Sequence, residues 1–137
     1  MLRSYQDLKV WQKSYDLCLQ VYRLTRAFPA SESYGLTSQM RRAAVSVPSN
    51  IAEGYGRTST AEYLRSLRIA YGSNCELETQ AMISKDLSYV KLDDAARLKE
   101  DIREVERMLK ALMRSLSSPA KNLRRSNPRP LGPSNPS

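Results

Sequence analysis

The strongest constraint on the fold is a strict hydrophobic repeat near the end of the chain. Its apolar residues are spaced four, three, four, three and four positions apart, and they are Leu98, Ile102, Val105, Leu109, Leu112 and Leu116. This is the a/d spacing of a helix that packs along one narrow seam. Acidic and basic residues alternate around the seam, and residues 92–116 sum to zero charge. We therefore predict a long helix here whose surface does not bind a polyanion.

An earlier segment repeats the helical spacing with a broader apolar face. Two neighbouring lines are present, namely Leu8, Trp11, Tyr15, Cys18 and Tyr22, and beside them Val10, Leu17, Val21 and Leu24. We expect Ser4 and Asp7 to form a capping box at the start of this helix. Phe28 and Pro29 should close it, because the residue before a proline is driven out of the α region. The Trp/Tyr line favours core or interface packing over a platform for stacked bases.

A second helical segment contains a proline inside its pattern. One face carries Leu36, Met40, Ala43, Ala44, Val47 and Ile51, with Thr37 as the expected N-cap. Pro48 lacks an N–H and crowds the carbonyl four residues earlier, so we expect the helix to bend or restart there. Gly54 and Gly56 should then end the helix at positions with positive φ.

Polar residues form a second line along this segment. We interpret the set as a structural polar line that a glutamate of the next helix joins, and its members are Arg42, Ser46, Asn50, Glu53, Arg57 and Glu76. Ser46, Asn50 and Glu53 should face another helix and form hydrogen bonds, because unpaired buried polar groups are costly. On this basis Glu53→Ala would destabilise the protein by about 1–3 kcal/mol. Glu53 and Glu76 are expected to pair with Arg42, Arg57 or backbone donors.

The third helical segment begins at a second predicted capping box, formed by Ser59 and Glu62. Its apolar side carries Tyr63, Leu64, Leu67, Ala70, Tyr71, Asn74, Leu77 and Ala81. Gly72 lies in the middle, where a glycine costs about 1 kcal/mol of helix propensity. A glycine at this position indicates the close approach of another backbone or of a partner.

These four segments predict an all-α protein, an antiparallel up-down-up-down four-helix bundle that occupies residues 1–117. Residues 118–137 are rich in Pro, Ser and Asn and cannot pack a core, so we expect a disordered basic tail. That tail either adds to polyanion binding or is a permissive extension. The several apolar lines exceed what one bundle core needs, which predicts self-association into a homo-oligomer.

The charge and the missing residue types narrow the function. The net charge is +8 with a pI near 9.7, and residues 1–117 contribute +4 of it. Such a balance favours nucleic acid or an anionic membrane surface as partner, or else serves solubility. No histidine is present, so we predict no metal, cofactor or catalytic role. The alternative would be a carboxylate enzyme that uses Glu53, Glu62, Glu76 and Glu78.

The location of the protein is predicted from what precedes the helices and from its cysteines. No secretory signal precedes the first helical segment, and no apolar run is long enough to span a membrane. The two cysteines, Cys18 and Cys75, are expected to be small packed thiols. We therefore predict a cytoplasmic protein with no membrane partner.

Three stretches of sequence carry a family resemblance. They are residues 7–13 (DLKVWQK), 34–54 (YGLTSQMRRAAVSVPSNIAEG) and 70–79 (AYGSNCELET). They resemble the four-helix-bundle family of bacterial 23S ribosomal-RNA intervening-sequence proteins, over about residues 5–116. The chain is also similar to the accessory protein of diversity-generating retroelements, which cooperates with a reverse transcriptase and binds nucleic acid. The resemblance implies a homopentameric ring.

Two functions remain open at this stage. The first is a non-catalytic oligomer that binds RNA or DNA through basic patches, for which the candidate contacts are Lys9, Lys13, Arg41, Arg42, Arg57, Arg65 and Arg68. The second is a scaffold or accessory subunit that docks a protein partner such as a reverse transcriptase, without direct nucleic-acid binding. A steep loss of nucleic-acid affinity with salt would favour the first.

Overall fold

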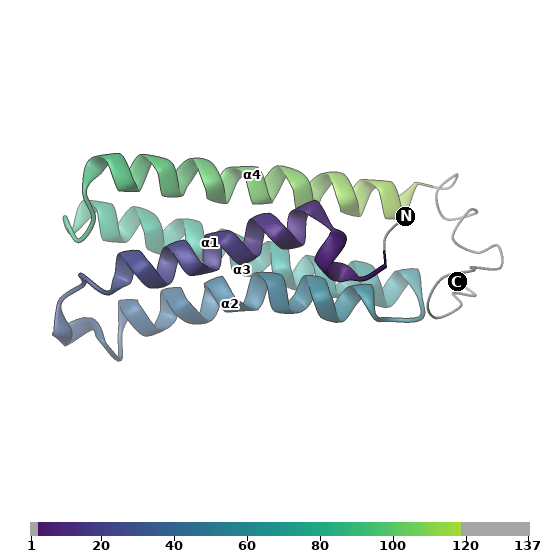
Figure 1. The fold of residues 1–137 in the computed structure, drawn as a ribbon, viewed down its shortest axis with the longest axis horizontal. Coiled ribbons are helices and arrows are strands. Elements are labelled where there is room, and N and C mark those ends of the chain that lie inside the picture. The colour runs from purple at the N-terminus through teal and green to yellow at the C-terminus, as the bar shows by residue number, and fades with distance from the viewer. Residues whose placement is uncertain (1–2, 119–137) are drawn as a thin grey trace.

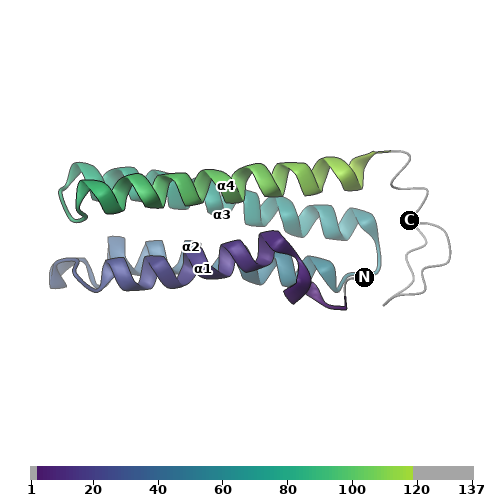
Figure 2. The same ribbon diagram turned by 45° about the horizontal axis from the view of Figure 1, so that its top comes forward.

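The computed structural model describes residues 3–118, which form four long helices and two short 3-10 helices. The long helices are α1 (Lys9–Thr25), α2 (Leu36–Tyr55), α3 (Thr60–Asp86) and α4 (Leu92–Ser117). Successive helices run in opposite directions, so α1 begins and α4 ends at the same end of the bundle (Figure 1). Turned by 45°, the view separates α3 and α4 from α1 and α2 (Figure 2). The predicted up-down-up-down four-helix bundle is confirmed.

The hydrophobic seam of α4 forms one wall of the core, as predicted. Five of its six residues are at most 3% exposed, and Leu112 is partly buried against them. On α1 the core line is Val10, Leu17 and Val21. In the neighbouring Trp/Tyr line, Leu8, Trp11 and Cys18 are partly buried against the core, whereas Tyr15 is 46% and Tyr22 is 37% exposed. This line is therefore only partly packed within one chain.

The helix starts agree with the sequence in part. Ser4 and Asp7 do form a capping box, but it caps the 3-10 helix η1 (Tyr5–Asp7), and α1 begins later at Lys9. Ser59 is the N-cap of α3, and its hydroxyl accepts a hydrogen bond from the Glu62 N–H. The prediction for Thr37 is wrong.

Helix α2 instead begins at Leu36, after a second 3-10 helix, η2 (Ala30–Glu32). The side chain of Glu32 accepts from the Leu36 N–H at 3.0 Å, so a carboxylate outside the helix satisfies one of its free donors. Thr37 is consequently already helical, and it is buried.

Helix α2 continues through Pro48 as a single element, so the proline does not restart it. Pro48 is buried. The prediction of positive φ at the helix end is also wrong, since Gly56 has a φ of −81° and Gly54 is still helical. Gly54 serves packing instead. A Cβ there would lie 2.8 Å from the Ser66 Cβ and 3.0 Å from Tyr63 Cδ1, both on α3.

Gly72 behaves differently from Gly54. It lies exposed in the middle of α3, and a Cβ built on it would meet nothing within 4 Å. The expected close approach of another backbone is therefore absent within the described chain. Cys75 is another correction, because it is exposed rather than packed, while Cys18 is half-buried and burial raises the pKa of its thiol.

The predicted basic tail lies outside the described residues, apart from Ser118. The division into a bundle at residues 1–117 and a tail at residues 118–137 stays a prediction. Within residues 3–118, no helix is both long enough and apolar enough to cross a membrane.

Candidate nucleic-acid interface

The excess positive charge of the bundle lies in its first half. Residues 3–57, which include α1 and α2, carry eight basic and four acidic side chains. Residues 58–118, which include α3 and α4, carry ten of each and are neutral overall. A polyanion is attracted to the side of the molecule where positive charge is in excess. The α1 and α2 side is therefore where a nucleic-acid contact is expected.

Three of the seven candidate cations are occupied by contacts within the chain. Lys13 forms ion pairs with Asp101 at 3.0 Å and Glu104 at 3.1 Å, both on α4. The hydrogen bond to Asp101, helped by the bond to Glu104, raises the pKa of the Lys13 ammonium. Arg57 pairs with Glu53 one helical turn earlier, at 2.6 Å.

Arg41 is the third of these, and it joins α2 to α1. Its Nε donates to the Thr25 hydroxyl at 2.9 Å, and its guanidinium lies 4.7 Å from the centre of the Tyr22 ring. A second, longer hydrogen bond runs from Arg41 to the Tyr22 carbonyl oxygen. None of these partners is a carboxylate, so they do not compensate the positive charge of Arg41.

The other four candidate cations are exposed and form no hydrogen bond or ion pair with residues 3–118. They are Lys9 on α1, Arg42 on α2, and Arg65 and Arg68 on α3. Among them, only Arg42 lies in two surface pockets. It is therefore the free cation that is best placed to meet a bound group.

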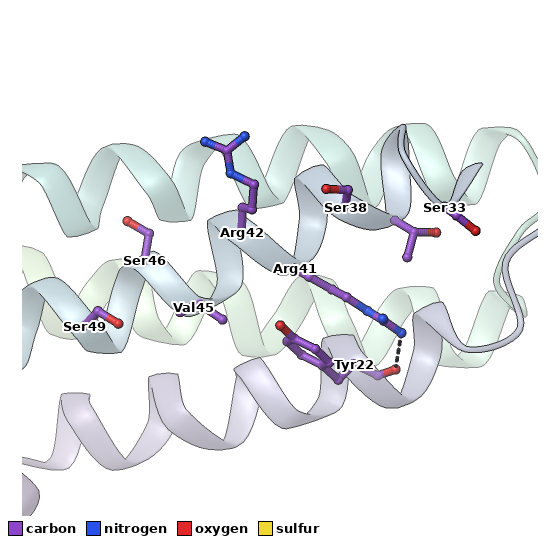
Figure 3. Close-up of a pocket in the computed structure, with 9 residues that line it drawn as sticks. Tyr22, Ser33, Ser38, Arg41, Arg42, Val45, Ser46 and Ser49 are labelled. Atoms are coloured by element: carbon purple, nitrogen blue, oxygen red, sulfur yellow. Dashed lines mark hydrogen bonds between the residues drawn. The ribbon is translucent and has the colours of Figure 1, made fainter. Parts of the chain in front are cut away.

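The first of these pockets, here called the α1/α2 pocket, has a volume of about 670 Å³ (Figure 3). It is lined by Tyr22, Ser33, Thr37, Ser38, Arg41, Arg42, Val45, Ser46 and Ser49. Two guanidinium groups and five aliphatic hydroxyls thus share one pocket, and no carboxylate lines it. In Figure 3, Arg41 points toward Tyr22 on α1, whereas Arg42 points to the other side of α2.

The second pocket, here called the α2/α3 pocket, lies on that other side and has a volume of about 420 Å³. It is lined by Gln39, Arg42, Ala43, Ser46, Ser73 and Glu76. Because Arg42 and Ser46 line both pockets, the two form one continuous surface across α2. Its hydroxyls are held in place, since Ser46 Oγ lies 2.7 Å from Ser73 Oγ and accepts from the Asn50 amide at 3.0 Å.

The pattern that defines the 23S rRNA-intervening sequence proteins matches residues 6–111. The chain belongs to this family. A protein of unknown function from the S23 ribosomal protein family of Bacteroides thetaiotaomicron is a structural neighbour, with a TM-score of 0.71 and 19% identity. The alignment covers 77% of this chain and 95% of that one, and at this identity it shows a shared fold. Comparison with curated proteins finds no match.

The sequence predicted that the polar line hydrogen-bonds to a neighbouring helix, and this prediction is confirmed only in part. Ser46 does bond to another helix through Ser73, whereas Asn50 donates back to its own helix, to the Ser46 carbonyl and hydroxyl. The prediction that Glu53 hydrogen-bonds to another helix is wrong, whereas its expected pairing with Arg57 is confirmed. The Glu53 side chain is 54% exposed, and its ion pair is with Arg57.

The expected pairing of Arg42 is wrong as well. Glu76 accepts a hydrogen bond from Gln80, one turn later on α3, and not from Arg42. The two charged groups lie on different helices, and their charged atoms are more than 4.0 Å apart. Arg42 and Glu76, two charged members of the polar line, are therefore not paired with each other.

The four carboxylates considered for catalysis do not converge. Glu53 and Glu62 line a third pocket of about 290 Å³ together with Arg57 and Arg65. Glu76 lies in the α2/α3 pocket, and Glu78 accepts from Arg103 on α4. Within residues 3–118, no three acidic or cysteine side chains are placed to hold a metal ion.

Sequence reasoning missed several neutral residues of the pocket. Ser38, Val45 and Ser49 line the α1/α2 pocket, and with Arg42 they are spaced four, three and four positions apart. This helical line was visible in the sequence beside the polar line. No sequence pattern pointed to Tyr22 as a pocket residue, because its contact with Arg41 joins two different helices.

Proposed function

We propose that this protein is a non-catalytic, homo-oligomeric module that binds RNA or DNA through the outer face of α2. The observation that carries the proposal is the composition of the α1/α2 pocket, which is lined by two arginines and five residues with aliphatic hydroxyls and by no carboxylate. Arginine and hydroxyl side chains are among the groups that proteins use to contact phosphate oxygens. The family name, which refers to sequences that interrupt 23S rRNA, agrees with a nucleic-acid partner.

Arg42 is the central contact in this proposal. Its guanidinium is exposed and unpaired within residues 3–118, so a phosphate would not have to compete with a carboxylate for it. Arg41 adds a second positive charge, which Thr25 and Tyr22 hold in one position. Lys9, Arg65 and Arg68 extend the contact along the bundle. Lys13 and Arg57 are left out, because carboxylates within the chain already neutralise them.

Contacts of this type position a strand without reading its sequence. The sequence carries no recognition-helix signature that would direct side chains at base edges. We therefore propose binding that depends on charge and backbone shape, with affinity that falls steeply as salt rises.

The homo-oligomer is supported by two separate exposed apolar patches. One lies on α1 and contains Tyr15 and Leu19, which are 46% and 41% exposed. The other lies where α3 leads into α4 and contains Met82, Ile83, Leu87 and Leu92. Two different patches that cover each other form a head-to-tail contact, which closes into a ring when the rotation between subunits allows it. Five subunits are favoured by the family resemblance, and a ring would repeat Arg42 and so increase avidity.

The proposal is tested by fluorescence anisotropy with a labelled single-stranded RNA and the matching DNA. Arg42→Ala should weaken binding of both by at least about tenfold, because each subunit of the oligomer loses one phosphate contact. Lys13→Ala is the matched control, since it also removes one positive charge but from a neutralised position. Light scattering after size-exclusion chromatography should report an oligomer. A monomer, or equal effects of the two variants, would contradict the proposal.

A protein scaffold is the second candidate, and one observation favours it. A pocket of about 240 Å³ between α3 and α4 combines the apolar side chains of Ala81, Met82, Ala95 and Ile102 with charged residues at its edge. Such a surface suits a protein partner, for which a reverse transcriptase is the candidate that the resemblance implies. Substitution of Met82 by a charged residue would then abolish binding of the protein partner.

A further inference from the structure

We infer that the α2/α3 pocket distinguishes RNA from DNA, with Glu76 accepting a hydrogen bond from a ribose 2′-hydroxyl. This inference rests on the proposed function, because it assigns a sugar contact beside the phosphate contact at Arg42. The pocket volume of about 420 Å³ lies within the range of small-molecule sites and is large enough for one nucleotide unit.

Glu76 is oriented by a buried amide. Gln80 is only 4% exposed, and its Nε2 donates to Glu76 Oε2 at 3.1 Å. The Gln80 Oε1 is buried and has no hydrogen-bond partner among the described residues. A flipped amide would set this oxygen against the carboxylate, so the donor must face Glu76. This hydrogen bond holds one carboxylate oxygen of Glu76 in place. The other oxygen can still accept a hydrogen bond from a group bound in the pocket.

Both helices bring donors to the pocket: Arg42 and Ser46 lie on α2, and Ser73 lies on α3 with Glu76. Arg42 supplies a guanidinium that forms no ion pair with Glu76 across the pocket. Ser46 and Ser73 share one hydroxyl proton in their 2.7 Å contact, and Ser46 also accepts from Asn50. The second hydroxyl proton of this pair is left to donate elsewhere. The pocket thus presents the Arg42 guanidinium to an anion from α2 and the Glu76 carboxylate as a charged acceptor from α3.

Glu76 would favour RNA in two ways. It accepts a hydrogen bond from ribose, and it repels a strand that has no 2′-hydroxyl to donate. A carboxylate beside a phosphate site repels every nucleic-acid backbone, so Glu76 lowers affinity for a strand that cannot donate to it. Deoxyribose has no donor at its 2′ position, whereas ribose has a hydroxyl there. Carboxylates recognise ribose hydroxyls in the same way in dinucleotide-binding folds.

The experiment measures anisotropy of the full chain with three labelled strands of one sequence: RNA, DNA and 2′-O-methyl RNA. We expect RNA to bind about tenfold more tightly than either of the others, since one hydrogen bond to a charged group gives an effect of this size. Glu76→Ala should remove the difference and leave DNA affinity equal or higher. Glu78→Ala is the matched control, because it removes the same charge two residues away, where the side chain pairs with Arg103.

The outcomes separate this inference from the proposed function. Tight but equal binding of all three strands would overturn the RNA selectivity and leave nucleic-acid binding intact. A preference for RNA that persists in Glu76→Ala would also overturn it, by placing the sugar contact elsewhere. Failure to bind any strand would overturn the proposed function itself.

Discussion

The contact between α2 and α3 at Gly54 can be tested by adding a single methyl group. Gly54→Ala would place a Cβ 2.8 Å from the Ser66 Cβ, a distance that real Cβ atoms essentially never show. Tyr63 lies nearly as close, with Cδ1 at 3.0 Å and its carbonyl oxygen at 3.3 Å. Neither the Ser66 Cβ nor the Tyr63 carbonyl can turn away, so the two helices must move apart.

The expected effect combines two terms of opposite sign. Overpacking of a well-packed site costs about 1–3 kcal/mol, and the fixed neighbours of Gly54 place it in the upper part of that range. Alanine in place of a helical glycine stabilises the helix by about 1 kcal/mol. We therefore expect Gly54→Ala to lower the free energy of unfolding by about 1–2 kcal/mol.

Gly72→Ala is the matched control, because it makes the same change in α3 where nothing lies within 4 Å. Only the helix-propensity term remains, so the free energy of unfolding of this variant should rise by about 0.5–1 kcal/mol. Urea unfolding followed by far-ultraviolet circular dichroism, at one fixed protein concentration, measures both variants. A Gly54→Ala protein at least as stable as the wild type would refute the close approach of α2 and α3.

Three further substitutions or truncations follow from the same contacts. Glu53→Ala should change the free energy of unfolding by no more than about 0.5 kcal/mol, because an exposed pair one turn apart contributes little; a loss above 1 kcal/mol in urea unfolding would restore the buried role. Lys13→Ala should cost about 0.5–1 kcal/mol at neutral pH, given two partly exposed ion pairs. Since folding raises the Lys13 pKa above its ordinary 10.5, this difference from wild type should be constant between about pH 7 and pH 10.5 and vanish at higher pH, and a difference that grows above pH 7 would contradict the ion pairs. Removal of residues 118–137 should leave helicity and subunit number unchanged while weakening nucleic-acid binding, because four positive charges are lost; a truncated protein that dissociates would show that the tail is structural.

The fold could be predicted because its signals are local. The spacing of Leu98, Ile102, Val105 and Leu109 determines which face of α4 is buried, and no knowledge of the partner helices is needed. The capping role of Ser59 is local as well, since its hydroxyl bonds three residues ahead. Thr37 was predicted wrongly because a carboxylate from a separate turn, that of Glu32, satisfies the helix start first.

The candidate site was harder to predict because charge pairing depends on distant residues. Lys13 and Arg42 look alike in sequence, each a cation on an amphipathic helix. Only the packing of α1 on α4 brings Lys13 to Asp101, which is 88 positions away. Arg42 likewise has no carboxylate partner because Glu76 accepts a hydrogen bond from Gln80 instead. Sequence alone therefore gave the set of cations but not which of them remain free.

The proposed contact of Arg42 with phosphate is tested most directly by the salt dependence of binding. The dissociation constant for one single-stranded RNA is measured between 50 mM and 200 mM salt, for the wild type and for Arg42→Ala. We predict a steep linear fall of log affinity with log salt in the wild type, and a slope lower by at least about 0.7 in the variant, the value of one lost phosphate contact on a single strand. Equal slopes for the two proteins would contradict a phosphate contact at Arg42.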